Sequence, residues 1–157
     1  MTRTKALGLL YKQLQKDSSM SRMGMPDYLM VFRKPGDNAE PITHTPGEFP
    51  VEQWQQWASP VWMDIKQTNT LNTKGARDSA DERHICPLQL DLIERAITMW
   101  SNRGDTVLSP FIGIGSEGYC AITMGRKFIG IELKDSYFRQ AADYLLGASA
   151  QDDLFAA

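Results

Sequence analysis

Three glycines and one acid in the second half of the chain have the types and spacing of a ligand site. Gly113, Gly115 and Gly118 form the pattern G-x-G-x-x-G, and Glu132 ends the β-prone run that follows. Glycine lets the backbone turn sharply and approach a ligand without a Cβ in the way. At the tip of a neighbouring parallel strand, a carboxylate can accept hydrogen bonds from both hydroxyls of a ribose. The pattern therefore predicts a nucleotide-type site with Glu132 on the sugar.

A glycine triplet of this kind also occurs as a turn that binds nothing. Two features favour a site here. The loop is entered through Ser109, Pro110 and Phe111, where the proline has no amide to donate and the phenylalanine is placed at the mouth of the crevice. Glu132 directly follows an apolar strand, as such a pocket requires. We also expect Ser116 to cap the helix that begins at the loop.

Regular elements must hold these residues, and residues 88–146 have the necessary apolar periodicity. The expected elements are a helix over 88–102, a strand at 106, a helix over 116–124, a strand at 128 and a helix over 135–146. This order predicts an α/β fold, part of a doubly wound, Rossmann-like parallel sheet. We expect residues 147–157 to form a frayed tail.

The first half of the chain is less regular. Apolar spacing predicts a helix over Ala6–Lys16, and the apolar, aromatic run Asp27–Lys34 predicts a buried strand. Prolines then interrupt the chain repeatedly, so residues 35–83 are predicted to be an irregular insertion with one short helix near Val51–Ala58. Three tryptophans within this insertion favour a small satellite core over direct base stacking. They are Trp54, Trp57 and Trp62.

The composition sets limits on partners. The 157 residues are most simply one domain, and the net charge of −2 gives no overall basic signature. A local group of cations can still bind nucleic acid. Lys74, Arg77 and Arg83 lie in a polar stretch that favours a solvated loop, with a phosphate-contacting loop as the second interpretation.

Cysteine content and hydropathy add expectations about compartment. Cys86 and Cys120 lack metal-ligand spacing, so we expect both to be reduced and buried, with no metal site. The sequence shows neither a cleavable leader nor an apolar stretch of membrane-spanning length. We therefore expect a soluble, cytoplasmic protein with no membrane partner.

Three blocks in order resemble S-adenosylmethionine-dependent DNA methyltransferases that modify exocyclic amines, either N6 of adenine or N4 of cytosine. The blocks read HICPLQL from His84, SPFIGIGS from Ser109 and GRKFIGIE from Gly125, and the resemblance is closest over residues 81–145. Their order resembles the permuted class, in which the catalytic half precedes the cofactor half. The resemblance implies residues 1–34 as a remnant of the catalytic half, 35–83 as a target-recognition-like insertion, 84–146 as the cofactor-binding subdomain and 147–157 as a tail.

The resemblance also implies S-adenosylmethionine as cofactor, double-stranded DNA as partner and a role for each matched residue. His84, Cys86 and Pro87 fall where the family wraps backbone around the cofactor, Ser109, Pro110 and Phe111 where it holds the methionine moiety, Gly113, Gly115 and Ser116 at the turn, and Glu132 at the ribose. Many members have Asp where Ser109 stands, which implies a hydroxyl contact in place of a carboxylate. Alternatively, His84 is a hydrogen-bonding residue at a helix start, Phe111 belongs to the core and Tyr137 packs rather than binds.

The family's catalytic motif, Asp, Asn or Ser followed by Pro-Pro and an aromatic, is not found. The chain has eight prolines and no two are adjacent, so no catalytic residue is assigned. In the permuted order this motif would lie before Met1. We therefore expect activity only with a complementing catalytic half, or a homodimer that covers the open sheet edge.

Two other functions remain open. The first is a non-catalytic remnant that binds cofactor or DNA. The second is a nicotinamide-dependent oxidoreductase, which keeps the glycine pattern but leaves the His84 and Ser109 blocks unexplained.

Overall fold

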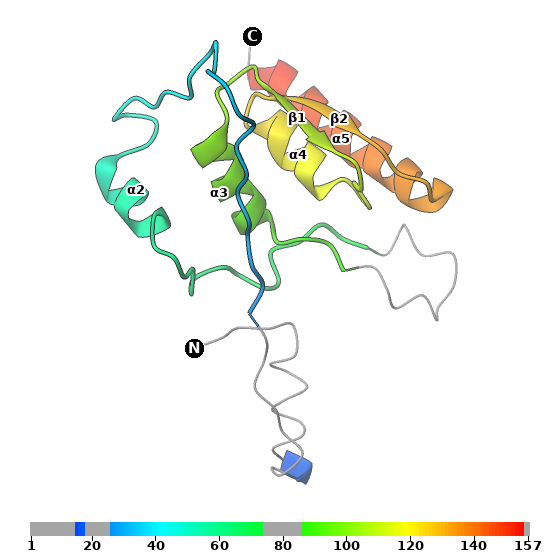
Figure 1. Cartoon of the computed structure of the whole chain (residues 1–157). Coiled ribbons are helices and arrows are strands. Elements are labelled where there is room, and N and C mark those ends of the chain that lie inside the picture. Colours follow the sequence, from blue (N-terminus) through cyan, green and yellow to red (C-terminus); the bar gives the residue numbers. More distant parts are fainter. Residues whose placement is uncertain (1–14, 18–25, 74–85, 156–157) are drawn as a thin grey trace.

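The computed structural model describes residues 15–17, 26–73 and 86–155, with side chains described as far as residue 151. The regular elements are α2 (Val51–Trp57), α3 (Leu90–Trp100), β1 (Thr106–Ser109), α4 (Ser116–Thr123), β2 (Lys127–Gly130) and α5 (Asp135–Phe155), shown in Figure 1. The predicted order of helix, strand, helix, strand and helix after Pro87 is confirmed.

Strands β1 and β2 lie side by side and parallel. Thr106 pairs with Lys127 and Ser109 with Gly130. Helix α4 connects the two strands, which makes a β-α-β unit, the repeating element of α/β sheets. The pairing continues beyond the strand ends, because the amide of Ile131 donates to the carbonyl of Ser109 at 3.0 Å. This part of the prediction, a partial Rossmann-like α/β sheet, is confirmed.

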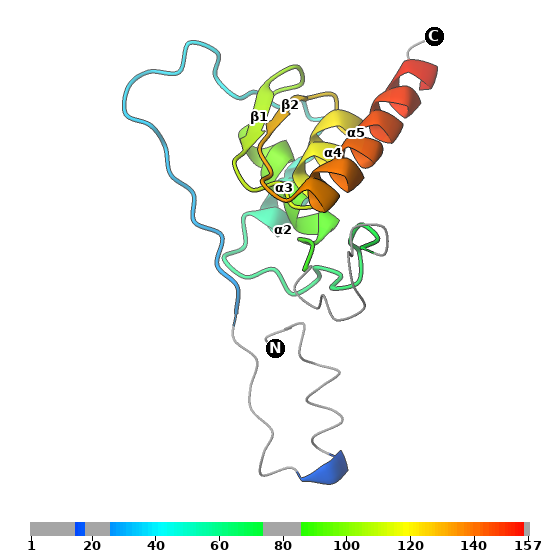
Figure 2. The same ribbon diagram turned by 90° about the vertical axis from the view of Figure 1, so that its right-hand side faces the viewer.

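Helices α3, α4 and α5 all lie on one face of the two strands (Figure 2). Ile93 and Ile97 of α3 pack against Cys120 and Ala121 of α4 to form the main buried cluster, with Val107 and Phe128 from the strands against it. The two strands thus bury one face, and the other face is open. Their outward residues include Leu108, which is 62% exposed.

Gly118 sets the distance between α4 and the sheet. A Cβ at this position would lie 2.6 Å from the ring of Phe128, too close for any larger residue. The third glycine of the pattern is therefore explained by close helix–strand packing rather than by a ligand.

The predicted buried strand over Asp27–Lys34 is wrong. These residues are extended but carry no strand pairing, and Tyr28 and Phe32 are each 84% exposed. A strand needs a neighbour to satisfy its backbone, and β1 and β2 pair only with each other in the part of the chain that the structure describes.

The predicted tail is also wrong, because α5 continues to Phe155. Ala148 is buried, so packing continues beyond Gly147 and holds the helix. The predicted helix over Ala6–Lys16 lies outside the described residues except for Gln15 and Lys16, which are helical.

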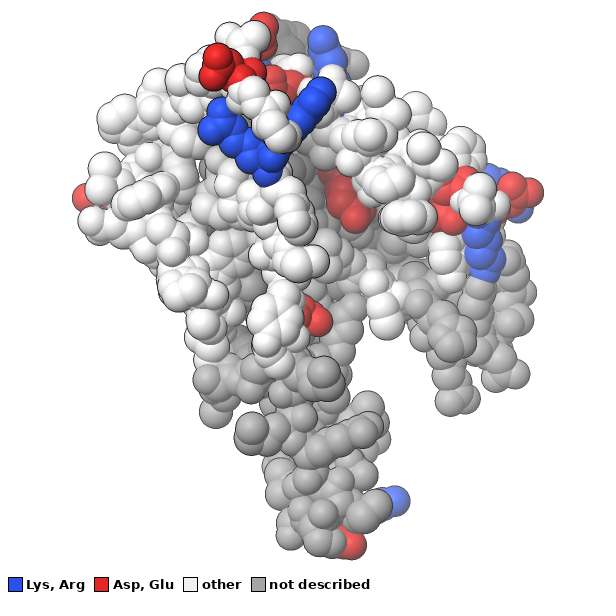
Figure 3. Space-filling view, viewed as in Figure 1, with Lys and Arg blue, Asp and Glu red and all other residues white. Residues whose placement is uncertain are grey.

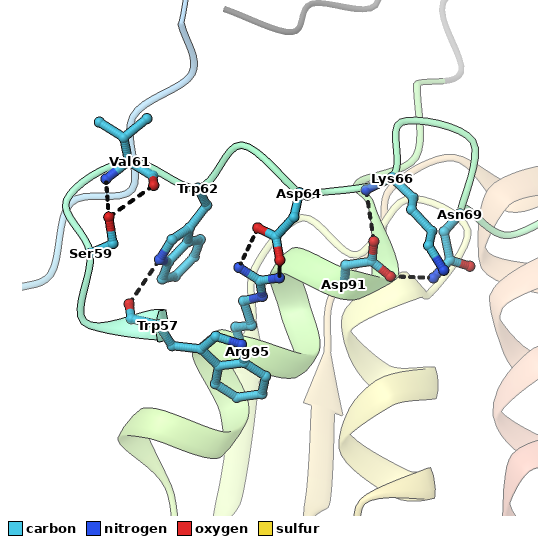
Figure 4. A network of polar contacts seen from close by, with 9 residues as sticks. All are labelled: Trp57, Ser59, Val61, Trp62, Asp64, Lys66, Asn69, Asp91 and Arg95. Carbon is cyan, nitrogen blue, oxygen red and sulfur yellow. Dashed lines mark hydrogen bonds and ion pairs between the residues drawn. The ribbon is translucent and has the colours of Figure 1, made fainter. Parts of the chain in front are cut away.

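The insertion contains the predicted short helix, α2, and is fastened to α3 through Arg95 (Figure 4). The guanidinium donates to both carboxylate oxygens of Asp64, at 3.1 and 2.6 Å. It also lies 5.3 Å from the ring centroids of both Trp57 and Trp62. Trp57 and Trp62 are half-buried on either side of this guanidinium, whereas Trp54 is 53% exposed, so the tryptophans do not form one common core.

Candidate cofactor site

The glycine loop connects the end of β1 to the start of α4. Gly113 and Gly115 have φ angles of 53° and 92°, in the left-handed region that side chains with a Cβ rarely adopt. The amide of Gly115 donates to the carbonyl of Ile112 at 2.8 Å and closes the turn. The tight turn predicted from the glycines is confirmed.

The predicted helix cap at Ser116 is wrong. Gly115 occupies the N-cap position, Ser116 is the first helical residue, and no side chain caps α4. The first amides of a helix have no carbonyl partner within it. The N-cap glycine makes no side-chain cap hydrogen bond, and the carboxylate of Glu117 in this first turn interacts with its own backbone. The other amides of the turn are donors of the kind that suit an anionic group of a ligand.

Glu132 lies beside this loop, as its position after β2 predicts. Its Oε2 accepts a hydrogen bond from the amide of Gly113 at 2.9 Å. Its Oε1 accepts from the amides of Leu133 at 3.0 Å and Lys134 at 2.9 Å. The carboxylate therefore holds the glycine loop against the end of β2, 19 residues further along the chain.

These contacts limit how Glu132 can meet a ribose. A carboxylate has about four acceptor positions, and three amides use three of them here. One sugar hydroxyl can be accommodated directly. A second hydroxyl can bind only if one amide moves away or shares its acceptor oxygen with the hydroxyl.

Ser109 and Phe111 lie at opposite extremes of burial. Ser109 is buried at the end of β1, and Phe111 is 84% exposed. The alternative in which Phe111 belongs to the core is therefore wrong. An uncovered ring beside a ligand loop is open to contact, as the run Ser109-Pro110-Phe111 suggested.

The block that begins at His84 is only partly described. Cys86 is exposed, so the expectation that both cysteines are buried is wrong for it and confirmed for Cys120. Leu90, just after Cys86 and Pro87, packs against Ile114 of the glycine loop. His84, Lys74, Arg77 and Arg83 lie outside the described residues.

A second contact with the loop was not predicted. Leu71 is buried against Ile114, with Tyr119, Tyr137 and Tyr144 packed around them. The hydroxyl of Tyr144 donates to the carbonyl of Asn72 at 2.9 Å. The segment at Leu71 and Asn72 therefore packs against the glycine loop and α5. Tyr137 packs in this cluster, as its alternative interpretation held. The only signal in the sequence was a single leucine in an otherwise polar stretch.

Two ionisable groups of α4 are perturbed by burial. Burial raises the pKa of the Cys120 thiol to about 12, with Glu94 and Glu117 adding to the effect. Cys120 is therefore an uncharged, unreactive core residue. Burial also raises the pKa of Glu117, which lies in the first turn of α4. Among the described residues, no group of acids, cysteines or histidines could hold a metal ion.

A family model and several known proteins are similar to this chain. A family model described as DNA methylase matches residues 5–143. The Type II methyltransferase M.MthZI of Methanothermobacter thermautotrophicus is 32% identical over 117 residues, which are 71% of this chain and 32% of that protein. The DNA adenine methyltransferase YhdJ of Escherichia coli K12 is 50% identical over 48 residues, 31% of this chain and 16% of that protein.

A solved structure similar to this chain is also that of a DNA methylase. A candidate DNA modification methylase from Thermus thermophilus, crystallised with S-adenosyl-L-methionine, superposes with a TM-score of 0.55 at 25% identity, over 80% of this chain and 48% of that one. This chain thus spans about half of that structure and a third of M.MthZI. With 139 residues matched by the family model (5–143), the chain belongs to the DNA methylase family of N6-adenine and N4-cytosine methyltransferases.

Proposed function

We propose that the glycine loop binds S-adenosylmethionine and that this chain is the cofactor-binding and target-recognition part of a DNA N6-adenine or N4-cytosine methyltransferase. The observation that carries the proposal is the hydrogen bond from the amide of Gly113 to the carboxylate of Glu132, which lies beyond the ends of two adjacent parallel strands. Ligands of open α/β sheets bind at this end of the strands.

The residues present fit the cofactor. Uncapped amides at the start of α4 suit its carboxylate, Glu132 suits its ribose and the exposed ring of Phe111 suits its sulfonium cation. When bound, S-adenosylmethionine supplies a methyl group, whose bond to sulfur breaks as a bond to the exocyclic nitrogen of the base forms and the amine loses a proton. Ser109, Pro110, Cys86, Pro87 and, outside the described residues, His84 are proposed to complete the contacts.

DNA is proposed to meet the insertion. Lys74, Arg77 and Arg83 would contact phosphates, which position a protein on DNA without reading sequence. Transfer itself needs an Asp, Asn or Ser followed by Pro-Pro and an aromatic, and no two prolines of this chain are adjacent. We therefore propose that a complementing catalytic half supplies this motif. The reaction would take place in the cytoplasm; no described helix is long and apolar enough to span a membrane.

Calorimetry tests the cofactor part of the proposal. The chain is titrated with S-adenosylmethionine and, separately, with NAD. Binding of the first without the second supports the proposal, and the reverse result would favour the oxidoreductase alternative. Binding to neither would reject the site.

Transfer of a labelled methyl group to double-stranded DNA tests the catalytic part. The chain is assayed alone and with the catalytic portion of a relative. We expect transfer only in the mixture. Cofactor binding combined with inactivity in every mixture would favour the second candidate, a non-catalytic binding module, which the lack of adjacent prolines supports.

A further inference from the structure

One face of the two-stranded sheet exposes apolar residues that no other described part of the chain covers. Leu108 and Ile129 lie opposite each other in register on the face without helices and are 62% and 56% exposed. Ile131 follows on β2's continuation and is also exposed. We call these three residues the outer sheet face. Parallel strands with apolar residues on both faces are typical of sheets covered on both sides.

The backbone of β1 is also open on one side. Within residues 26–73 and 86–155, its only strand partner is β2. The opposite edge therefore presents amide and carbonyl groups that can pair with another strand.

A second uncovered apolar feature lies on the same side of the molecule. Residues 28–32, the apolar segment, run extended past the β1 side of the sheet in both views of the ribbon (Figures 1 and 2). All five of its side chains are exposed large hydrophobics. In Figure 3, charged side chains gather at the upper and right-hand margins and in one acidic patch near the centre, and most of the remaining described surface is uncharged.

The composition of the apolar segment indicates what covers it. A run of consecutive apolar residues is typical of a strand inside a sheet, buried on both faces with a neighbour on each side. A two-stranded sheet cannot provide such a position. The covering polypeptide must bring several strands together with helices.

We infer that the outer sheet face, the free edge of β1 and the apolar segment form one docking surface for a polypeptide that carries the remaining strands and helices of a methyltransferase sheet. This inference rests on the proposed function, because that polypeptide would carry the catalytic motif. Its size is consistent with the match to the Thermus thermophilus structure, where this chain covers 48% of the length. A second copy is a poorer fit, because its sheet carries helices on one face only.

Binding of the unmatched portion of the Thermus thermophilus methylase, measured by sedimentation, tests this surface. The full chain is expected to form a one-to-one complex. Leu108→Glu places a charge on the outer sheet face and should weaken the complex at least tenfold. Leu146→Glu is the matched control, since Leu146 lies on α5 and is 70% exposed. It should bind as the parent does. Circular dichroism verifies that both variants fold.

Three results would overturn the inference: no complex with the corresponding portions of M.MthZI and the Thermus thermophilus methylase, equal losses in both variants, or a dimer of the chain alone that Leu108→Glu dissociates. The last would assign the surface to a second copy. Calorimetry with S-adenosylmethionine on the chain alone separates the two proposals. If the complex forms but the cofactor does not bind, the docking surface is supported and the proposed function is rejected. If the cofactor binds but no complex forms, the proposed function is supported and the docking surface is rejected.

Discussion

Glu132 combines two tasks at the scale of a single residue. It accepts one hydrogen bond from Gly113 of the glycine loop and two from the amides of Leu133 and Lys134, so the loop is tied to the segment after β2 before any ligand arrives. A preformed loop avoids the entropic cost of ordering it on binding. The same carboxylate is the proposed partner of the ribose. A substitution at Glu132 should therefore affect both the loop and the ligand.

Glu132→Ala should weaken S-adenosylmethionine binding by about 1.5–3 kcal/mol, the contribution of hydrogen bonds to a charged group. This corresponds to roughly a 10- to 150-fold rise in Kd by calorimetry. Glu52→Ala is the control, because Glu52 is an exposed acid on α2. A Glu132→Ala variant that titrates like the parent would remove Glu132 from the site.

Gly113 and Gly115 can be separated by paired alanine substitutions. A Cβ at Gly113 would meet no atom within 4 Å, whereas at Gly115 it would lie 2.9 Å from Cδ1 of Leu145 and 3.1 Å from Ala141. Both positions have positive φ, which costs an alanine about 1–2 kcal/mol. We expect Gly113→Ala to lose cofactor binding with a modest drop in Tm, and Gly115→Ala to lose more stability because α4 and α5 must separate. Equal Tm values would contradict this ranking.

The elements outside the β-α-β unit are joined to it by a few specific contacts. Arg95 joins the insertion to α3, and Leu71 and Asn72 join it to the glycine loop and to Tyr144 of α5. Asp91 adds a third contact, accepting from the amide of Lys66 at 2.7 Å. An insertion of low regular content is positioned in this way by side chains rather than by its own secondary structure.

Arg95→Ala should release the Trp57–Asp64 segment. The substitution removes a buried guanidinium, two cation–π contacts and a two-pronged ion pair, while half-exposed Asp64 regains water. We expect a loss of about 1–3 kcal/mol in the free energy of unfolding and a red shift of tryptophan emission. Arg139→Ala, on α5, is the control. An unchanged emission spectrum would show that other contacts hold the segment.

The first turn of α4 should give a pH-dependent stability. Burial raises the folded-state pKa of Glu117 above its ordinary value of 4.5. A raised pKa means that the folded state holds the proton more tightly, so this contribution is present below pH 4.5 and is lost as pH rises through the folded pKa. Glu117→Gln should therefore raise Tm relative to the parent at about pH 7, and the gain should vanish near about pH 4. A gain independent of pH would reject burial of the charge as its cause.

At the scale of the whole molecule, the described residues form a β-α-β unit with helices on one face of its strands and exposed apolar residues on the other. Its stability therefore depends on the small core between α3, α4 and the strands, with α5 packed against α4. Anything that binds the folded chain alone adds to that stability.

S-adenosylmethionine at about one hundred times its Kd should stabilise the chain by about 2.7 kcal/mol. For a domain of this size, that corresponds to a rise in Tm of roughly 5–11 °C. Scanning fluorimetry in the presence of the cofactor measures it, with NAD at equal concentration as the control. An equal rise with both ligands would mean that the effect is not specific.

The local elements of the cofactor half could be predicted from the sequence alone. The predicted starts at residues 88, 106, 116 and 128 lie within two residues of the observed starts of α3, β1, α4 and β2. Gly113, Gly115 and Glu132 marked the turn and the acid beside it. These features depend on nearby residues and on the geometry of a β-α-β unit, which the order of elements specifies.

Features that depend on distant partners emerged only from the folded chain. The apolar run at 27–34 has strand-forming residues but pairs with no strand among the described residues, and it is extended and exposed. The sequence around Leu71 predicted a polar loop, whereas in the structure Leu71 is buried against Ile114. Gly147 was expected to end α5, but the helix continues past it and buries Ala148. Pairing and burial are properties of two segments at once, and a sequence pattern describes one segment at a time.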